Sequence, residues 1–170
     1  QRVASPNAEV ISMIKAVIFD MDGVIAMTND FQSRAESRVL STVGINMKPD
    51  DIVKKYAGWK DIDVFKDILK NSPSRKAAHK LRELKWEMVQ EEFNQADLLP
   101  VPGVVELIEL LLSNGFMLGV ASGSSRPFFD NVLEKVKVRE KFQVLLSSDD
   151  VSIGKPDPEI FLIAKKKLGV

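Results

Sequence analysis

The chain has 170 residues, and its 24 lysines and arginines balance 24 aspartates and glutamates, so no net charge attracts nucleic acid or an anionic membrane surface. Hydrophobic residues make up 45%, which is enough for a packed core, yet no apolar run approaches the roughly 20 residues of a membrane span. The lack of cysteine excludes a disulfide scaffold and thiolate metal sites, and it favours the cytoplasm, with an organelle reached after processing left open as an alternative.

The first predicted element is a short buried strand close to the N-terminus. Residues 1–13 have neither the pattern of a signal peptide nor an arginine-rich transit composition, so we interpret them as an extension outside the fold. The apolar run 16–19 then stops abruptly at Asp20. About 95 residues separate it from the next strand, which is too many for an ordinary crossover between parallel strands.

This long intervening segment has a helical pattern. Helices are predicted near residues 30–43, 49–56, 62–70 and 75–94. We therefore expect residues 28–99 to form an all-helical cap domain inserted after the first strand.

After the cap, strands and helices alternate. Apolar runs at 116–121 and 144–146 predict buried strands, and helices are expected at 103–113, 125–136 and 158–168. The alternation predicts an α/β fold: a Rossmann-like parallel sheet of about three strands, built from the discontinuous segments 14–27 and 100–170.

Polar residues follow each predicted strand. Asp20 and Asp22 follow the first, Ser122 and Gly123 the second, and the loop after the third leads to Lys155. Ligands bind at the carboxyl ends of the strands in open α/β sheets, so these residues should share one crevice. Two carboxylates, a hydroxyl, a free backbone N–H and a lysine form a set suited to phosphoryl transfer.

Electrostatics indicates a metal cofactor. A phosphate dianion about 4 Å from the Asp20 carboxylate is repelled by roughly 8 kcal/mol at an effective dielectric constant of 20. Lys155 offsets one unit of this charge, and a hard divalent cation offsets two more. Mg²⁺ is the expected cofactor because it accepts few protein ligands together with phosphate and water.

Three stretches of the chain carry these residues, and they resemble the first three motifs of the haloacid dehalogenase superfamily in order and spacing. They are Asp20-Met21-Asp22-Gly23-Val24-Ile25, Ala121-Ser122-Gly123-Ser124 and Gly154-Lys155-Pro156-Asp157-Pro158-Glu159-Ile160-Phe161. Within that superfamily, residues 14–170 are similar to the phosphatase and β-phosphoglucomutase-like group, which has a helical cap.

The resemblance implies a role for each residue. Asp20 would be the nucleophile and a Mg²⁺ ligand, and Asp22 the general acid and base whose backbone carbonyl also binds Mg²⁺. Ser122 and the N–H of Gly123 would hold the phosphate, while Lys155 orients nucleophile and phosphate. The dehalogenases lack the second aspartate, so Asp22 argues against dehalogenation.

The sequence departs from this group in two places. The family has a fourth motif of paired acids beyond the position of Val170, so we expect an incomplete chain with an unpaired edge on the first strand, weak Mg²⁺ binding and slow turnover. The mutases also have a histidine where this chain has Gln32, and a cap arginine near Trp59 and Lys60, which favours a hydrolase. Trp59 and Lys60 are candidate substrate contacts, although Trp59 could equally pack between cap helices.

We therefore interpret the chain as a Mg²⁺-dependent phosphatase that hydrolyses a small phosphorylated metabolite through an aspartyl-phosphate. Sugar phosphates are among the candidate substrates. Two alternatives stay open: a hexose-phosphate mutase, and a catalytically silent interaction module or inactive fragment. The expected partner is a small-molecule phosphate ester, with neither nucleic acid nor membrane. The sequence predicts neither the substrate nor the oligomeric state.

Overall fold

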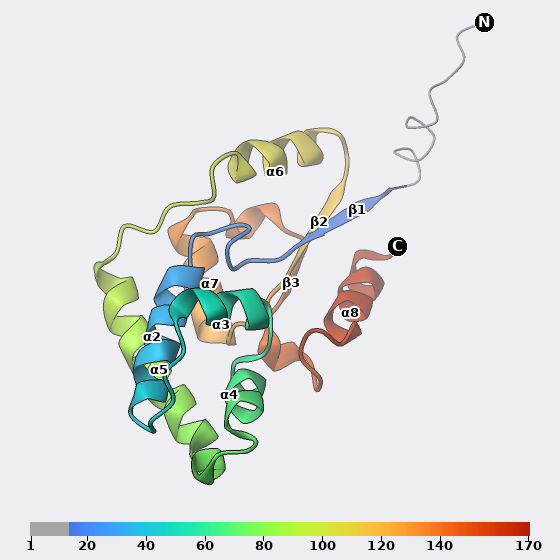
Figure 1. Cartoon of the computed structure of the whole chain (residues 1–170). Coiled ribbons are helices and arrows are strands. Elements are labelled where there is room, and N and C mark those ends of the chain that lie inside the picture. Colours follow the sequence, from blue (N-terminus) through green and yellow to red (C-terminus); the bar gives the residue numbers. More distant parts are fainter. Residues whose placement is uncertain (1–13) are drawn as a thin grey trace, which may run out of the picture.

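A parallel three-stranded sheet forms the centre of the computed structural model, which describes residues 14–170 (Figure 1). Strands β1 (Ala16–Phe19), β2 (Met117–Ala121) and β3 (Val144–Leu146) lie in the order β1-β2-β3. The predicted α/β class is confirmed, and all three strands end at one edge of the sheet. The extension predicted for residues 1–13 lies outside the described residues.

Both faces of the sheet are covered, as a doubly wound fold requires. Side chains alternate along each strand, so neighbours such as Ile18 and Phe19 belong to different apolar clusters. Helices α6 (Val104–Ser113) and α7 (Arg126–Lys135) contribute to the cluster that contains Phe19. Helix α8 (Glu159–Leu168) contributes to the other one, and short 3₁₀ turns η2 (Arg139–Lys141) and η3 (Ser148–Asp150) flank β3.

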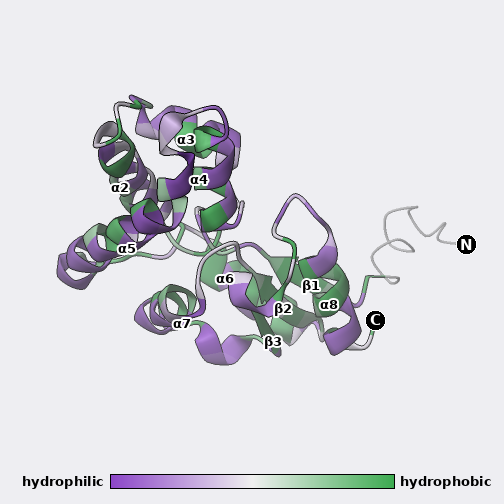
Figure 2. Cartoon of the chain, turned by 90° about the horizontal axis from the view of Figure 1, so that it is seen from below, coloured by the Kyte–Doolittle hydropathy of each residue, from purple (hydrophilic) through white to green (hydrophobic). Residues whose placement is uncertain are grey.

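Every regular element between residues 28 and 99 is a helix. These are α2 (Asn29–Ser41), α3 (Pro49–Tyr56), α4 (Asp61–Leu69), the 3₁₀ turn η1 (Pro73–Ala77) and α5 (Ala78–Gln95). They gather beside the sheet in Figure 2 and have an apolar cluster of their own, in which Leu40, Phe65 and Leu81 are buried. A single helix was predicted from residue 75; instead the Ser72 hydroxyl accepts the Ser74 N–H and starts η1 first.

The helical segment leaves the sheet and returns to it along two adjacent stretches. Ala26 and Pro100 form an antiparallel bridge, and the Val101 N–H donates to the Ile25 carbonyl at 2.9 Å. Entry and exit therefore lie side by side, which is the geometry that a hinged insertion needs.

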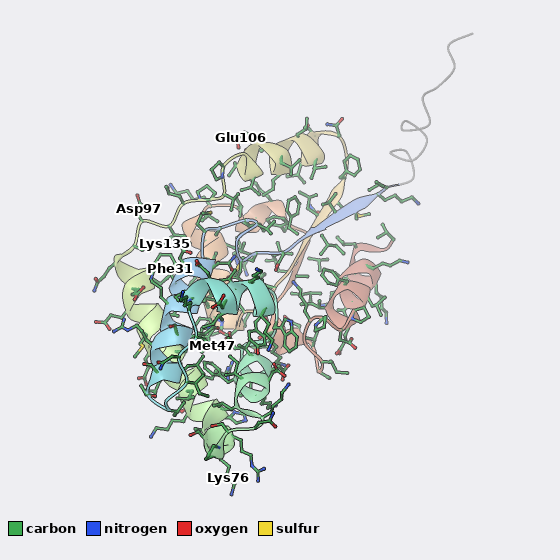
Figure 3. The ribbon with its side chains drawn as sticks, viewed as in Figure 1. Phe31, Met47, Lys76, Asp97, Glu106 and Lys135 are labelled. Atoms are coloured by element: carbon green, nitrogen blue, oxygen red, sulfur yellow. The ribbon has the colours of Figure 1, made fainter. Side chains whose placement is uncertain are left out.

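Helix α5 also packs on α7. The Phe128 ring lies 4.9 Å from the Trp86 ring and 5.3 Å from the Phe93 ring, measured between centroids. Lys135, labelled in Figure 3, donates to the Phe93 carbonyl at 2.7 Å. None of the described helices is both long and apolar enough to cross a membrane, and the predicted cytoplasmic location stays a prediction.

Candidate active site

Residues that follow the three strands meet at the carboxyl edge of the sheet. Lys155 reaches across from the loop after β3, and its Nζ lies 2.9 Å from Asp20 Oδ1 and 2.8 Å from the Ala121 carbonyl oxygen. The Met21 N–H also donates to Asp20 Oδ1 at 2.9 Å. The Asp20 carboxylate is thus held at the end of β1 by a cation and a backbone donor, with 30% of the side chain still exposed.

A tight turn after β1 brings Asp22 back toward the same edge. The Met21 carbonyl accepts the N–H groups of Val24, Ile25 and Ala26, and Gly23 has a φ of +76°, which an L side chain adopts only with strain. The Asp22 carbonyl takes part in none of these turn bonds.

The Asp22 carboxyl accepts four side-chain hydrogen bonds. Thr28 Oγ1 and Gln32 Nε2 donate to Oδ1 at 2.5 and 2.7 Å. Ser122 Oγ and Ser124 Oγ donate to Oδ2 at 3.0 and 2.9 Å. The sequence pointed to Ser122 but missed Thr28 and Ser124, and it marked Gln32 only as a departure from the mutases. No signal in the sequence pointed to this role, because Thr28 precedes Asn29 and Asp30 and Ser124 lies in a run of small polar residues, and only the structure shows that both are buried.

The environment of Asp22 favours its protonated form. Burial raises the pKa of the Asp22 carboxyl, the neighbouring Asp20 charge raises it further, and the hydrogen bonds from Thr28, Ser124 and Ser122 oppose the shift. A raised pKa keeps a proton on the carboxyl at a higher pH, which is the state that a general acid requires.

The loop before α4 lies directly over these residues. A Cβ on Gly58 would be 3.7 Å from Asp20 Oδ2 and 3.5 Å from Lys155 Cδ. A Cβ on Gly123 would be only 2.5 Å from the Trp59 carbonyl oxygen and 2.6 Å from that of Gly58. The backbone of the loop before α4 and that of the loop after β2 are therefore so close here that no side chain fits between them.

We expect Gly123→Ala to push this loop away from the site. Since the added methyl group would meet backbone atoms, the loop itself must move, and a displacement of about 1 Å near a reacting centre can cost about 100-fold in rate. Steady-state kinetics should show that loss in kcat/KM. Gly44→Ala is the control, because an added Cβ there meets no atom within 4 Å and only backbone strain at φ +78° results. An unchanged kcat/KM in Gly123→Ala would contradict the expectation.

The two predicted cap contacts lie in different surroundings. Trp59 packs edge-on against Tyr56 with 5.4 Å between ring centroids, and it lines the cavity described next. Lys60 Nζ donates to the Val151 carbonyl at 3.2 Å, outside that lining. A substrate contact for either residue stays a prediction.

A small polar cavity lies between Asp22 and the helices α2, α3 and α4. It offers about 40 Å³ that water can occupy, whereas small-molecule sites measure roughly 300–1,000 Å³. The space between these helices and Asp22 is therefore smaller than a small-molecule ligand requires.

A fully buried lysine stands behind this cavity. Lys85 Nζ, from α5, donates to Asp61 Oδ1 at 2.6 Å and Gln32 Oε1 at 2.8 Å, and it lies 3.1 Å from Glu36 Oε1. Burial alone would lower the pKa of Lys85, but the Asp61 and Glu36 carboxylates outweigh it and raise that pKa. Because Gln32 also donates to Asp22, one hydrogen-bonded chain joins Lys85 on α5 to the Asp22 carboxyl after β1.

Metal ligands are sparse at this site. Across residues 14–170 no group of three or more histidines, cysteines, aspartates or glutamates is arranged to hold a metal ion. The Asp20 carboxylate, which Lys155 contacts, and the Asp22 carbonyl, which accepts no backbone hydrogen bond, offer oxygen atoms, and oxygen is the donor that Mg²⁺ prefers. These residues fit a cation that takes its other ligands from water and phosphate.

Known proteins are similar to this chain in sequence and in fold. The family model described as haloacid dehalogenase-like hydrolase matches residues 17–170. Hexitol phosphatase B of Escherichia coli is 29% identical over 168 residues, covering 92% of this chain and 71% of the relative. A phosphorylated carbohydrates phosphatase of Thermotoga maritima is 30% identical over 159 residues, covering 92% and 72%.

Solved structures agree with these sequence matches. A crystal structure of β-phosphoglucomutase from Clostridium difficile superposes with a TM-score of 0.80 at 26% identity, covering 93% of this chain and 72% of the other. The relatives named here are two phosphatases and a β-phosphoglucomutase. The chain therefore belongs to the haloacid dehalogenase-like hydrolases, as a phosphoric monoester hydrolase or a phosphomutase of that family.

Proposed function

We propose that this protein is a Mg²⁺-dependent phosphatase that hydrolyses a small phosphorylated metabolite of the sugar-phosphate class through an aspartyl-phosphate. The observation that supports this proposal is that two carboxyls with different surroundings lie at one edge of the sheet. Asp20 is partly exposed and contacts Lys155. Asp22 is shielded and accepts hydrogen bonds from three hydroxyl groups and one amide. The relatives named for hexitol and carbohydrate phosphates support the substrate class.

In the first half-reaction the Asp20 carboxylate attacks phosphorus, and the bond from phosphorus to the leaving oxygen breaks. Lys155 keeps Asp20 in place and offsets one negative charge of the phosphate. Ser122 and the Gly123 N–H are proposed to hold the phosphate oxygens. In the structure the Ser122 hydroxyl donates to Asp22, so it would have to rotate toward a bound phosphate.

Asp22 is proposed to handle the protons in both half-reactions. Its raised pKa suits it to give a proton to the leaving oxygen. The resulting Asp22 carboxylate can then take a proton from the water that attacks the aspartyl-phosphate, which restores both carboxyls.

Mg²⁺ would be held by the Asp20 carboxylate and the Asp22 carbonyl, and when bound it would offset the charge between nucleophile and phosphate. We further propose that residues 28–99 act as a cap domain on the core formed by 14–27 and 100–170. Its paired entry and exit at Ala26 and Pro100 and its own apolar cluster support this division. Closure of the cap would exclude water from the site during attack.

A hexose-phosphate mutase is the second candidate, favoured by the likeness to β-phosphoglucomutase. A mutase must hold a phosphorylated intermediate while it keeps water out, which requires dedicated cap contacts. Gln32 stands where the mutases resembled by this sequence have a histidine, so the hydrolase is preferred.

The test is phosphate release from p-nitrophenyl phosphate and from glucitol 6-phosphate, in Mg²⁺ and in excess EDTA. Asp20→Asn should lower turnover about 1,000-fold or more, because loss of a nucleophile removes the covalent route. Asp30→Asn, an exposed acid in the first turn of α2, is the matched control and should keep full activity. Equal signals from wild type and Asp20→Asn would support the silent module. Conversion of β-glucose 1-phosphate into the 6-phosphate without phosphate release would identify a mutase.

A further inference from the structure

The cavity between cap and core has an acidic wall. Its lining combines core residues with residues of the cap helices, and the polar side chains among them include Asp22, Ser124, Gln32, Glu36, Tyr56 and Asp61. Three of these are carboxyls, and none of the described lysines, arginines or histidines lines the cavity. Lys155, which holds Asp20, lies outside the lining as well.

The cationic side chain next to this wall, Lys85, already contacts other groups of the protein. Lys85 lies behind the wall with no exposed side-chain surface, and its ammonium contacts Asp61, Glu36 and Gln32. An ammonium has three N–H donors, so these three acceptors take them all. A negative group that entered the cavity would meet carboxylates without a free cationic donor.

One oxygen on this wall has no donor. Asp61 Oδ2 is buried and accepts no hydrogen bond from any described residue, although Asp61 Oδ1 is bonded to Lys85. The Asp61 side chain is 7% exposed and lines the cavity. A buried carboxylate oxygen is stabilised by a donor, and a ligand hydroxyl in the cavity that Asp61 lines would be such a donor.

We propose that the cap end of the cavity binds an uncharged, polyhydroxylated leaving group, with a hydroxyl of the substrate donating to Asp61 Oδ2. This inference rests on the proposed phosphatase function and narrows its substrate class. The substrate is a sugar or sugar alcohol that carries a single phosphate. A second phosphate or a carboxylate at the far end of the substrate is rejected by the carboxylates of Asp61 and Glu36.

The effect of a negative charge at the far end of the substrate can be tested with two substrates of equal length. Glucitol 6-phosphate and 6-phosphogluconate differ only at C1, which is a neutral hydroxymethyl group in the first and a carboxylate in the second. We expect wild-type kcat/KM to be about 100-fold higher for glucitol 6-phosphate, since like charges placed together in a closed site are strongly unfavourable. A ratio within about threefold of unity would overturn the proposal.

Asp61→Asn tests the residue itself. The substitution keeps the size of the side chain and removes its charge, so the ratio of the two kcat/KM values should fall about tenfold. A general loss of activity lowers kcat/KM for both substrates by the same factor, so it leaves this ratio unchanged. Asp63→Asn, a partly exposed acid in the same helix outside the lining, should keep the wild-type ratio. An unchanged ratio in folded Asp61→Asn would overturn the role of Asp61.

p-Nitrophenyl phosphate is a substrate without a polyol group, so its hydrolysis tests the proposed phosphatase function separately from the polyol site. If the wild type releases phosphate from none of the three compounds, the phosphatase proposal fails. If it hydrolyses p-nitrophenyl phosphate but neither sugar compound, the phosphatase proposal stands and the polyol site is overturned. Should Asp61→Asn not fold, the wild-type ratio and the ratio in Glu36→Gln, which neutralises the same wall, decide the outcome.

Discussion

Asp22→Asn is expected to release one equivalent of p-nitrophenol per active site and then nearly stop. p-Nitrophenolate leaves without a proton, so Asp20 can still be phosphorylated in this variant. The aspartyl-phosphate then persists because the asparagine cannot take a proton from the attacking water. Steady-state turnover should fall about 100- to 10,000-fold, the range that general acid and base catalysis supplies. Stopped-flow absorbance, with the enzyme concentration comparable to that of the substrate, measures burst and steady state together.

Sugar phosphates should behave differently in the same variant. A sugar alkoxide is a poor leaving group, so loss of the Asp22 proton blocks the first half-reaction as well as the second. With glucitol 6-phosphate we therefore expect neither a burst of product nor a phosphorylated protein. Intact-mass spectrometry, which detects one added phosphoryl group, distinguishes the two substrates.

The control for this experiment is Ser124→Ala. It removes one of the four donors to Asp22 but keeps the carboxyl, so turnover should fall without accumulation of a phosphorylated protein. A burst in Ser124→Ala equal to that in Asp22→Asn would mean that the protonating group is another residue. A normal steady-state rate in Asp22→Asn would contradict the acid and base role altogether.

The sheet and the strand-terminal residues were readable in the sequence because short buried strands leave a simple pattern. Apolar runs that stop at Asp20, Ser122 and the loop before Lys155 fix the edge at which these side chains meet. The structure indeed places Lys155 against Asp20 and Ser122 against Asp22. Parallel topology alone gives this convergence, because all strands point to the same edge.

The residues that helices α2, α4 and α5 contribute to the site could not be predicted from the sequence in the same way. Gln32, Asp61 and Lys85 are far apart in sequence and meet only through the packing of α2, α4 and α5. In a helical pattern a charged residue is normally taken for the solvated face, and Lys85 lies among other charged residues of α5. Lys85 can be fully buried because the Glu36 and Asp61 carboxylates on neighbouring helices contact its ammonium group. The periodicity of a single helix does not reveal such partners.

Lys85→Met is expected to lower the free energy of unfolding by about 3–5 kcal/mol at pH 7, the cost of leaving a buried charge without its partner. The methionine fills a similar volume, but Glu36 and Asp61 then lie buried without a cation. Urea unfolding followed by circular dichroism measures the loss. Lys80→Met, on the exposed side of the same helix, should change stability by less than about 0.5 kcal/mol.

The deficit of Lys85→Met should also depend on pH with a definite sign. Burial already raises the pKa of Glu36 in the wild type, with the Lys85 charge opposing, so removal of Lys85 raises that pKa further in the folded state. A folded-state pKa above the unfolded one means that the folded protein binds more protons in between, so stability of the variant rises as pH falls. We therefore expect the deficit at pH 7 to shrink toward pH 5. The same deficit at both pH values, or its persistence when Glu36→Gln and Asp61→Asn are added, would show that lost packing, and not unpaired charge, destabilises the variant.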